Sequence, residues 1–220
     1  MTKLQEAWRE RSAVFHERAA DYDQWFEGSL LYAIELAAVR ELATPLAQPR
    51  IEVGVGPGRF AQDLGIAVGV DPALAPLMLA RARNIGVVQA VGEQLPLASD
   101  SAGSVFILFT LCFLAEPPRV LAECHRILRP GGHLVLGMVP AGGAWGRALQ
   151  AKKEENHPFY RHASFYQAGQ GVRWLQEAGF AVVESRSSLL QSPGELSEME
   201  HSRPVLDEQA GFCLLVGEKG

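Results

Sequence analysis

Short apolar runs alternate with stretches of helical spacing along most of the chain. Seven runs have the length and apolar character of strands, and the first five are apolar enough to be parallel strands covered on both faces. They span residues 50–55, 67–70, 86–90, 104–109, 133–139, 180–187 and 212–217. This alternation predicts an α/β fold built on a doubly wound sheet.

Helices are predicted between these runs. In residues 118–128 the apolar side chains of Val120, Leu121, Cys124 and Leu128 recur at spacings of three and four, which gives one apolar face. The pair Gly131-Gly132 is expected to end this helix. A second helix is predicted near residues 169–178, and a charged, helical region precedes the first strand.

We expect one domain, residues 1–220, because the length is close to that of a single domain. Within it, residues 1–48 form a helical N-terminal cap and residues 49–140 a ligand-binding core. Residues 141–166 form a lid over the substrate, and residues 167–220 supply the last helix and the last two strands. With 48% hydrophobic and 20% charged residues, the chain can bury a large core.

Charge and composition exclude several classes of protein. The formal net charge is −5, and no basic run is longer than Lys152-Lys153, which argues against nucleic acid as a partner. The apolar run at residues 105–115 is too short to span a bilayer. Residues 1–6 lack the apolar core of a signal peptide, so a cytoplasmic protein is expected. The three cysteines are widely separated, which favours reduced thiols and no metal site.

Ligands of doubly wound sheets bind at the carboxyl ends of the strands, and the first such turn is rich in glycine. Gly54, Gly56 and Gly58 follow the first strand at a spacing of two. Glycine lets a ligand approach the backbone without a Cβ atom in the way. The pattern differs from the G-x-G-x-x-G of dinucleotide sites, which disfavours NAD and FAD. A tight structural turn is the alternative interpretation.

A single carboxylate, Asp71, follows the second strand. At this position a carboxylate can accept hydrogen bonds from both hydroxyls of a ribose. It can also serve as the N-terminal cap of the helix that begins near Pro72. The two roles are compatible, and the nearby glycine turn favours the ribose.

Beyond these two features, the chain contains three further motifs. They are residues 20–26 (Ala-Asp-Tyr-Asp-Gln-Trp-Phe), residues 92–97 (Gly-Glu-Gln-Leu-Pro-Leu) and residues 126–132 (Arg-Ile-Leu-Arg-Pro-Gly-Gly). Together with Glu52 they resemble the class I S-adenosylmethionine-dependent methyltransferases, in the type 11 branch that contains the ubiquinone and menaquinone methyltransferases. The resemblance covers roughly residues 18–139. We therefore expect a Rossmann-like seven-stranded sheet, mostly parallel with the last strand antiparallel, and helices on both faces.

The resemblance implies a cofactor site for S-adenosylmethionine. The three glycines would line its methionine and ribose portion, with Glu52 supporting the turn or reaching the methionine amine through water. Asp71 would bind the ribose hydroxyls, and the backbone at Gly92 and Glu93 would meet the adenine. Phe109 and Thr110 would lie beside the sulfonium.

Two departures from the family pattern bear on the chemistry of the site. Val91 stands where many members carry an acid that contacts the adenine amine. Cys112-Phe113 replaces a His pair that follows the fourth strand in many members, so a general base from that position is missing. The acceptor is therefore expected to be nucleophilic already, or the base comes from elsewhere.

Residues 156–166 are rich in His, aromatic and Arg side chains for a loop, which suggests contact with a substrate. His157, Tyr160 and His162 are the candidates for a catalytic base or orienting group. The candidate substrate-binding residues are Tyr22, Trp25, Phe26, Cys112, Arg161 and Tyr166. In the alternative interpretation the aromatic side chains pack the cap onto the domain, Cys112 is a core thiol, and the His and Arg side chains are simply exposed.

These observations predict an enzyme that moves a methyl group from S-adenosylmethionine to a small molecule by in-line displacement and releases S-adenosylhomocysteine. A lipophilic or aromatic ring compound fits the aromatic cap, and a thiol fits the missing base. One alternative is a protein that binds the cofactor without catalysis. Another is an RNA, DNA or protein methyltransferase, for which a basic face would be expected.

Overall fold

The computed structural model describes residues 3–220, with side chains described from Trp8 onward. The prediction about a signal peptide rests in part on Met1 and Thr2, which lie outside the described residues. The helices are α1 (Lys3–Glu17), α2 (Ala19–Gln24), α3 (Leu30–Arg40), α4 (Arg59–Leu64), α5 (Leu74–Ala82), α6 (Pro117–Ile127), α7 (Ala144–Glu154) and α8 (Ala168–Glu177), with a short 3₁₀ helix, η1 (Leu111–Phe113). The strands are β1 (Arg50–Val53), β2 (Val68–Asp71), β3 (Gly86–Gln89), β4 (Ala102–Leu108), β5 (Leu128–Met138), β6 (Phe180–Ser188) and β7 (Phe212–Lys219).

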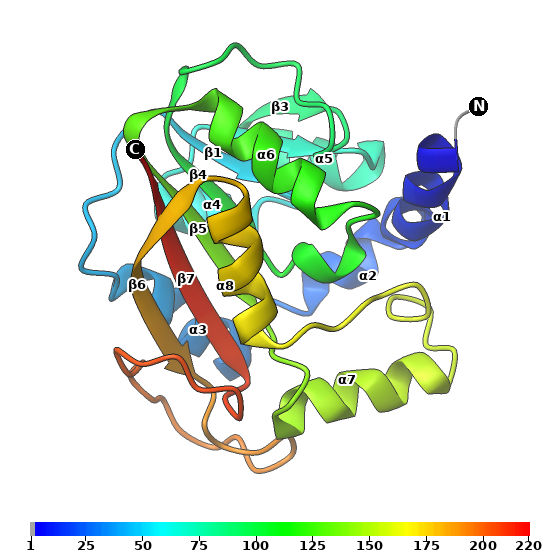
Figure 1. Ribbon diagram of the computed structural model, residues 1–220. Coiled ribbons are helices and arrows are strands. Elements are labelled where there is room, and N and C mark those ends of the chain that lie inside the picture. Colours follow the sequence, from blue (N-terminus) through cyan, green and yellow to red (C-terminus); the bar gives the residue numbers. More distant parts are fainter. Residues whose placement is uncertain (1–2) are drawn as a thin grey trace.

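The seven strands form one sheet in the order β3-β2-β1-β4-β5-β7-β6 (Figure 1). Strands β1 to β5 pair in parallel, and β7 is antiparallel to both of its neighbours. The chain therefore has the expected Rossmann-like fold, with the last strand antiparallel. All seven predicted strands are present.

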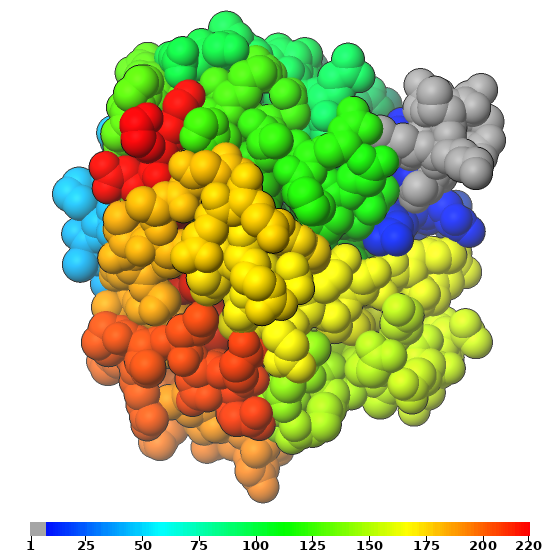
Figure 2. Space-filling model, viewed as in Figure 1, coloured from blue at the N-terminus to red at the C-terminus, as the bar shows by residue number. Residues whose placement is uncertain are grey.

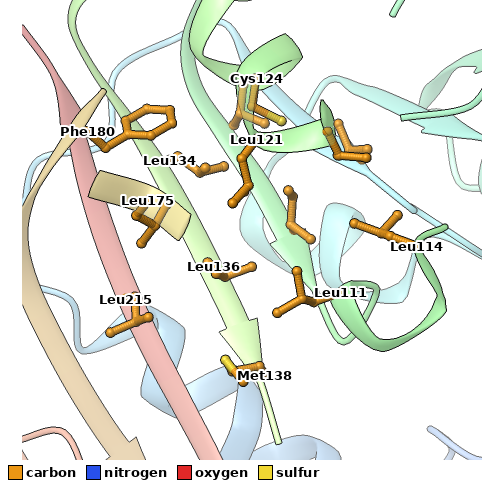
Figure 3. Packing of buried hydrophobic residues seen from close by; sticks show 14 of the residues in the cluster. Leu111, Leu114, Leu121, Cys124, Leu134, Leu136, Met138, Leu175, Phe180 and Leu215 are labelled. Atoms are coloured by element: carbon orange, nitrogen blue, oxygen red, sulfur yellow. The ribbon is translucent and has the colours of Figure 1, made fainter. Parts of the chain in front are cut away.

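Helices cover both faces of the sheet because the central strands are apolar on both faces. In β4, Val105 and Ile107 belong to the core beneath α6 and α8, whereas Phe106 and Leu108 belong to the core beneath α3, α4 and α5. This alternation follows from the two-residue period of a strand. Figure 3 shows the first core, where side chains of α6, α8, β5 and β7 interdigitate.

The predicted end of the helix before β5 was wrong. Helix α6 ends at Ile127, and β5 begins at the next residue, so Gly131 and Gly132 lie inside a strand. The pairing between β4 and β5 shifts register between Ala102 and Ser104. At this irregularity Gly131 has a φ of +72°, a conformation that favours glycine.

The cap predicted for residues 1–48 comprises α1, α2 and α3. A charged network fixes α2: Asp23 accepts hydrogen bonds from Arg59 at 2.7 and 2.8 Å and from Arg83 at 2.8 and 3.0 Å. Arg59 begins α4 and Arg83 follows α5, so the cap is tied to the sheet's own helices. In Figure 2 the yellow chain after α7 lies against the blue N-terminal helices.

The helices from Lys3 onward are all too short or too polar to cross a lipid bilayer.

Candidate active site

A cavity opens at the carboxyl ends of β1, β2 and β4, where the sheet order reverses from β1 to β4. We call it the strand-end cavity. Its lining comes from the turn after β1, the ends of β2 and β4, the segment after β3, and the cap helices. The lining includes Phe15, Tyr22, Phe26, Glu52, Gly54, Gly56, Asp71, Val91, Gly92, Glu93, Phe109, Thr110 and Phe113.

The glycine turn after β1 packs closely against the end of β4. A Cβ atom on Gly54 would lie 2.2 Å from Thr110 Oγ1, so this position has no room for a side chain. The Thr110 hydroxyl lies 3.2 Å from the Gly54 carbonyl and 3.1 Å from the Leu108 carbonyl, and either can accept its proton. At Gly56 a Cβ would meet only the Tyr22 ring, at 3.7 Å. The turn therefore packs against protein at Gly54, whereas at Gly56 its backbone is open to the cavity.

Asp71 sits at the end of β2 with its carboxylate beneath this turn. Its Oδ2 accepts a hydrogen bond from the Gly56 N–H at 3.0 Å, and its Oδ1 accepts one from the Ala73 N–H at 2.8 Å. The predicted role of Asp71 as the helix N-cap was wrong, because α5 begins at Leu74 with Ala73 as its N-cap residue and no side-chain cap; the Ala73 contact closes a turn before the helix. Each oxygen keeps a lone pair for a further donor. Burial raises the pKa of Asp71 to about 6, although the two N–H donors act in the opposite direction.

Glu52 is a second carboxyl in the same cavity, at 2% exposure in the middle of β1. Among the residues the structure describes, its Oε2 has no hydrogen-bond partner. Burial, together with the nearby Asp71 carboxylate, raises the pKa of Glu52 well above its ordinary value. A buried polar atom without a partner, facing a cavity, is a suitable contact for a polar ligand.

The segment after β3 supplies the far wall of the strand-end cavity through Val91, Gly92 and Glu93. The Glu93 carboxylate accepts hydrogen bonds from the N–H groups of Ala115 and Glu116, both at 3.2 Å. Glu93 thus anchors the loop between η1 and α6. The backbone around Gly92 and the apolar Val91 side chain are the surfaces that a flat ring would meet.

A second cavity of about 420 Å³ adjoins the first, and we call it the aromatic cavity. It lies between the cap, the end of β4, helix α7 and the segment that follows α7. Its lining is mainly aromatic and apolar, and includes Phe15, Tyr22, Trp25, Phe26, Tyr32, Glu35, Phe109, Cys112, Phe113, Trp145, Lys152, His157, Phe159, Tyr160 and Tyr166. Five of these residues, Phe15, Tyr22, Phe26, Phe109 and Phe113, line both cavities.

Phe109, the residue after β4, lines both cavities. It has a φ of +58°, which is uncommon for a residue with a large side chain. Its ring stacks on Phe212 with centroids 4.7 Å apart and lies 5.5 Å from Phe60. Strained backbone that packing holds in place is concentrated at functional sites. The observation supports Phe109 as part of the junction between the cavities.

The structure brings most of the predicted substrate and catalytic residues together. Tyr22, Trp25, Phe26, Cys112, His157, Tyr160 and Tyr166 all line the aromatic cavity. Arg161 is exposed, and neither it nor His162 belongs to the lining of the two cavities. Other residues of the lid predicted at 141–166, from Trp145 to Tyr166, supply much of the lining of the aromatic cavity.

The titratable groups of the aromatic cavity are poorly solvated. Burial raises the pKa of the Cys112 thiol to about 12 and raises the pKa of Tyr160 as well. Burial lowers the pKa of His157, and the charges of Lys152 and Arg18 act in the same direction. His157 Nδ1 is buried without a hydrogen-bond partner among the described residues. A neutral His157 can thus accept a proton or a hydrogen bond from a ligand.

Sequence reasoning missed Glu35, which is 7% exposed and lines the aromatic cavity from α3. Its burial raises its pKa well above the ordinary value. A signal was present: Glu35 is the single acid in an otherwise mostly apolar helix, four residues after Leu31, which lines the same cavity. Residues four apart share a helix face. Phe15, Phe113 and Phe159 were missed as well.

Comparison with known proteins agrees with this geometry. Residues 51–136 match the family described as "Methyltransferase domain". An uncharacterised protein of Mycobacterium tuberculosis is 40% identical over 201 residues, which cover 90% of this chain and 70% of that protein. The ubiquinone/menaquinone biosynthesis C-methyltransferase of Syntrophotalea carbinolica is 34% identical over 113 residues, 46% of this chain and 48% of that enzyme.

A solved structure from Thermotoga maritima is similar over almost the whole chain. It is described as a "SAM-dependent methyltransferase, possible histamine N-methyltransferase". The identity is 33% and the TM-score 0.88, with 94% of this chain and 99% of that chain covered. The chain thus belongs to the class I S-adenosylmethionine-dependent methyltransferases, in the type 11 branch. It is an enzyme of that class, and its cofactor is S-adenosylmethionine.

The polar groups and bare backbone of the strand-end cavity suit the chemistry of this cofactor. Asp71 offers free lone pairs to two hydroxyl donors, and Glu52 has an unpartnered oxygen to receive an amine. Gly56 presents bare backbone. Val91 and Gly92 leave an apolar wall for a purine.

Proposed function

We propose that this methyltransferase acts on a small-molecule acceptor, and that the strand-end cavity holds the cofactor while the aromatic cavity holds the acceptor. The observation that carries the proposal is the adjacency of the two cavities, which share Tyr22 and Phe109 in their walls. A transferred methyl group has to lie where cofactor and acceptor meet. The junction between the cavities is the place for it.

The shape and lining of the aromatic cavity support a small acceptor. Pockets for small molecules are mostly apolar with a few placed polar groups, and this cavity has a size within that range. A nucleic-acid substrate would require a basic face, and the chain carries a net charge of −5. The relative from Thermotoga maritima, whose description names a small amine, also supports a small acceptor. The acidic charge and three free cysteines support a reducing, cytoplasmic setting.

We assign the cofactor contacts as follows. Asp71 binds the ribose hydroxyls, Glu52 receives the methionine amine, and Gly54 and Gly56 allow close approach of the backbone. The prediction of Gly58 as a cofactor contact is not kept, because Gly58 lines neither cavity and a Cβ there would lie 2.6 Å from Ile85 Cδ1. Gly92 and Glu93 place their backbone along the adenine, and Phe109 and Thr110 lie beside the sulfonium. When bound, S-adenosylmethionine supplies an activated methyl group that an acceptor takes by in-line displacement, which leaves S-adenosylhomocysteine.

The remaining work of the protein is alignment and exclusion of water. The rings of Phe15, Tyr22 and Phe113 cover the junction from the cap and from η1, with Phe15 centred 5.2 Å from Tyr22 and 4.9 Å from Phe113. Orientation in a dry site can supply about 7 to 11 kcal/mol of a reaction barrier. His157 and Tyr160 stay the candidates among the predicted catalytic residues, because both face the aromatic cavity.

The first test is calorimetric titration with S-adenosylhomocysteine. Wild-type protein should bind it, and Asp71→Ala should weaken binding by about 1.5 to 3 kcal/mol through loss of charge-assisted hydrogen bonds. Asp207→Ala is the matched control, because Asp207 Oδ1 accepts an N–H two residues on, from Gln209 at 2.9 Å, as Asp71 does from Ala73. Equal affinities in wild type and Asp71→Ala would place the cofactor elsewhere.

A screen for release of S-adenosylhomocysteine with small phenols, thiols and amines would then test catalysis. Cofactor binding without turnover on any acceptor would favour a protein that binds the cofactor without catalysis.

A further inference from the structure

The chemistry of the aromatic cavity is dominated by one buried carboxyl group. Glu35 lies in the middle of α3, between the core residues Ile34 and Leu36, and is 7% exposed. None of the residues described by the structure forms a hydrogen bond or an ion pair with its side chain. Burial without a partner favours the neutral form of this carboxyl, and a cationic ligand beside it would favour the ionised form and pair with it.

Two phenol groups face the same cavity as Glu35. Tyr22 comes from α2 and Tyr160 from the segment after α7, and both line the aromatic cavity. Burial raises the pKa of each phenol, and the Glu35 charge adds to the rise in both, which places the three groups within electrostatic range of one another. The cavity thus holds a carboxyl and two hydroxyls in an otherwise apolar lining.

The surrounding rings suit a positive charge. The ring of Trp25 is centred 5.4 Å from Tyr22, 4.8 Å from Phe159 and 6.5 Å from Tyr160. Faces of Trp and Tyr rings attract cations, and organic ammonium groups are bound in this way in aromatic cages. Glu35 lines the same cavity, and its carboxylate would add a full opposite charge.

Two protein cations meet these rings, both from exposed side chains. Arg18 Cζ lies 5.4 Å from the centroid of the Phe159 ring, and Arg18 is not part of the lining of the aromatic cavity. Lys152 lines the mouth of the aromatic cavity but is exposed, and its Nζ lies over the Tyr160 ring at 5.8 Å from the centroid. Solvent screens an exposed charge at this distance much more than a buried one. His157 also lines the cavity, and its lowered pKa favours the neutral form.

We infer that the acceptor is an organic amine on an apolar or aromatic body, bound as an ammonium ion that pairs with the Glu35 carboxylate inside the ring of Tyr22, Trp25 and Tyr160. This inference rests on the proposed function, since it assigns the acceptor class of the same enzyme. Glu35 then supplies the charge for recognition, and the rings supply the apolar contact.

The test is titration of the protein saturated with S-adenosylhomocysteine. Phenethylamine and tryptamine are the cationic probes at pH 7.5, and 2-phenylethanol is the neutral analogue. Wild type should bind the amines at least tenfold more tightly than the alcohol. Glu35→Gln, which keeps shape and hydrogen bonding but removes the charge, should lose that preference and bind the alcohol unchanged. Glu177→Gln, on the exposed face of α8, is the matched control for loss of one acid.

The outcomes separate the two proposals. If wild type fails to bind S-adenosylhomocysteine, the proposed function fails, irrespective of Glu35. If the cofactor product binds and the amines do not, or bind no better than the alcohol, the inference about Glu35 is overturned. The same holds if Glu35→Gln binds amines as wild type does. The comparison of amine and alcohol in wild type needs no variant, so the inference is tested even if Glu35→Gln does not fold.

Discussion

Asp71 and Glu52 lie side by side in the strand-end cavity but are held differently. Asp71 is stabilised as an anion by the N–H groups of Gly56 and Ala73, whereas Glu52 has an oxygen without a donor among the described residues. The pKa of both carboxyls is raised, and each shift favours the protonated form. Cofactor binding through Asp71 needs the ionised form, because a carboxylate accepts two hydroxyls and a carboxylic acid is a poorer acceptor.

The raised pKa of Asp71 predicts how cofactor affinity depends on pH. Since the pKa of Asp71 is raised to about 6, the ionised form decreases as the pH falls through 6. At pH 5.5 about one quarter of the group is ionised, so S-adenosylhomocysteine should bind about fourfold more weakly than at pH 7.5. Titration calorimetry at the two pH values measures this ratio.

Asp71→Asn should bind more weakly at pH 7.5 and show a much flatter pH profile, because the titrating group is gone. A profile in Asp71→Asn that matches wild type would assign the pH dependence to another group, with Glu52 the nearest.

The sequence predicted the site residues that follow strand ends and missed those that depend on packing. Gly54, Asp71 and Phe109 could be predicted because topology alone brings the ends of β1, β2 and β4 together. Glu35 was missed because its relevance depends on which face of α3 meets the aromatic cavity. His162 and Arg161 were chosen by residue type, and their loop turns them away from the cavity lining.

At the scale of elements, α2 is a short helix whose position is fixed mainly by charge. It has no side-chain cap at its N-terminus, and Ala19 is its buried residue. Asp23 joins it to Arg59 and Arg83, with the three side chains between 14% and 20% exposed. Tyr22, next to Asp23, is thereby held over the glycine turn. The sequence motif at residues 20–26 predicted the importance of this segment. The contacts of Asp23 with Arg59 and Arg83 could not be predicted, because nothing in the spacing of these residues indicates them.

Asp23→Ala should therefore destabilise the cap. Removal of Asp23 leaves two partly buried guanidinium groups without their main partner, which costs about 2 to 4 kcal/mol. The free energy of unfolding in urea measures this. Asp21→Ala is the control on the same helix, because its ion pair with Arg18 is about half exposed and contributes less than about 1 kcal/mol. Equal losses in the two variants would show that the Asp23 network does not anchor α2.

At the scale of the whole molecule, the cover over the site is assembled from segments far apart in the chain. Phe159, which is 3% exposed, touches Phe15 of α1, Tyr22 of α2 and Trp25, with ring centroids 5.4, 5.7 and 4.8 Å apart. The cap and the segment after α7 thus lie against each other (Figure 2), and both contribute to the lining of the aromatic cavity. The sequence predicted both as cover, yet their contact is long-range and has no local signature.

Phe159→Ala should open this cover and expose the aromatic cavity to water. Cys112 faces that cavity, and its pKa is raised to about 12 because it is poorly solvated. Better solvation lowers the pKa, and each unit of decrease raises the reactive thiolate fraction about tenfold. Alkylation of Cys112 by iodoacetamide at pH 8, followed by mass spectrometry, should be several-fold faster in Phe159→Ala. Cys124 and Cys213, which are buried elsewhere, should label as slowly as in the wild type.

Val183→Ala is the control for Phe159→Ala, since Val183 is 47% exposed and lies outside both cavities. If Cys112 labels at the wild-type rate in Phe159→Ala, the aromatic contacts of Phe159 do not close the site, and α1 and α2 cover it without help from the segment after α7.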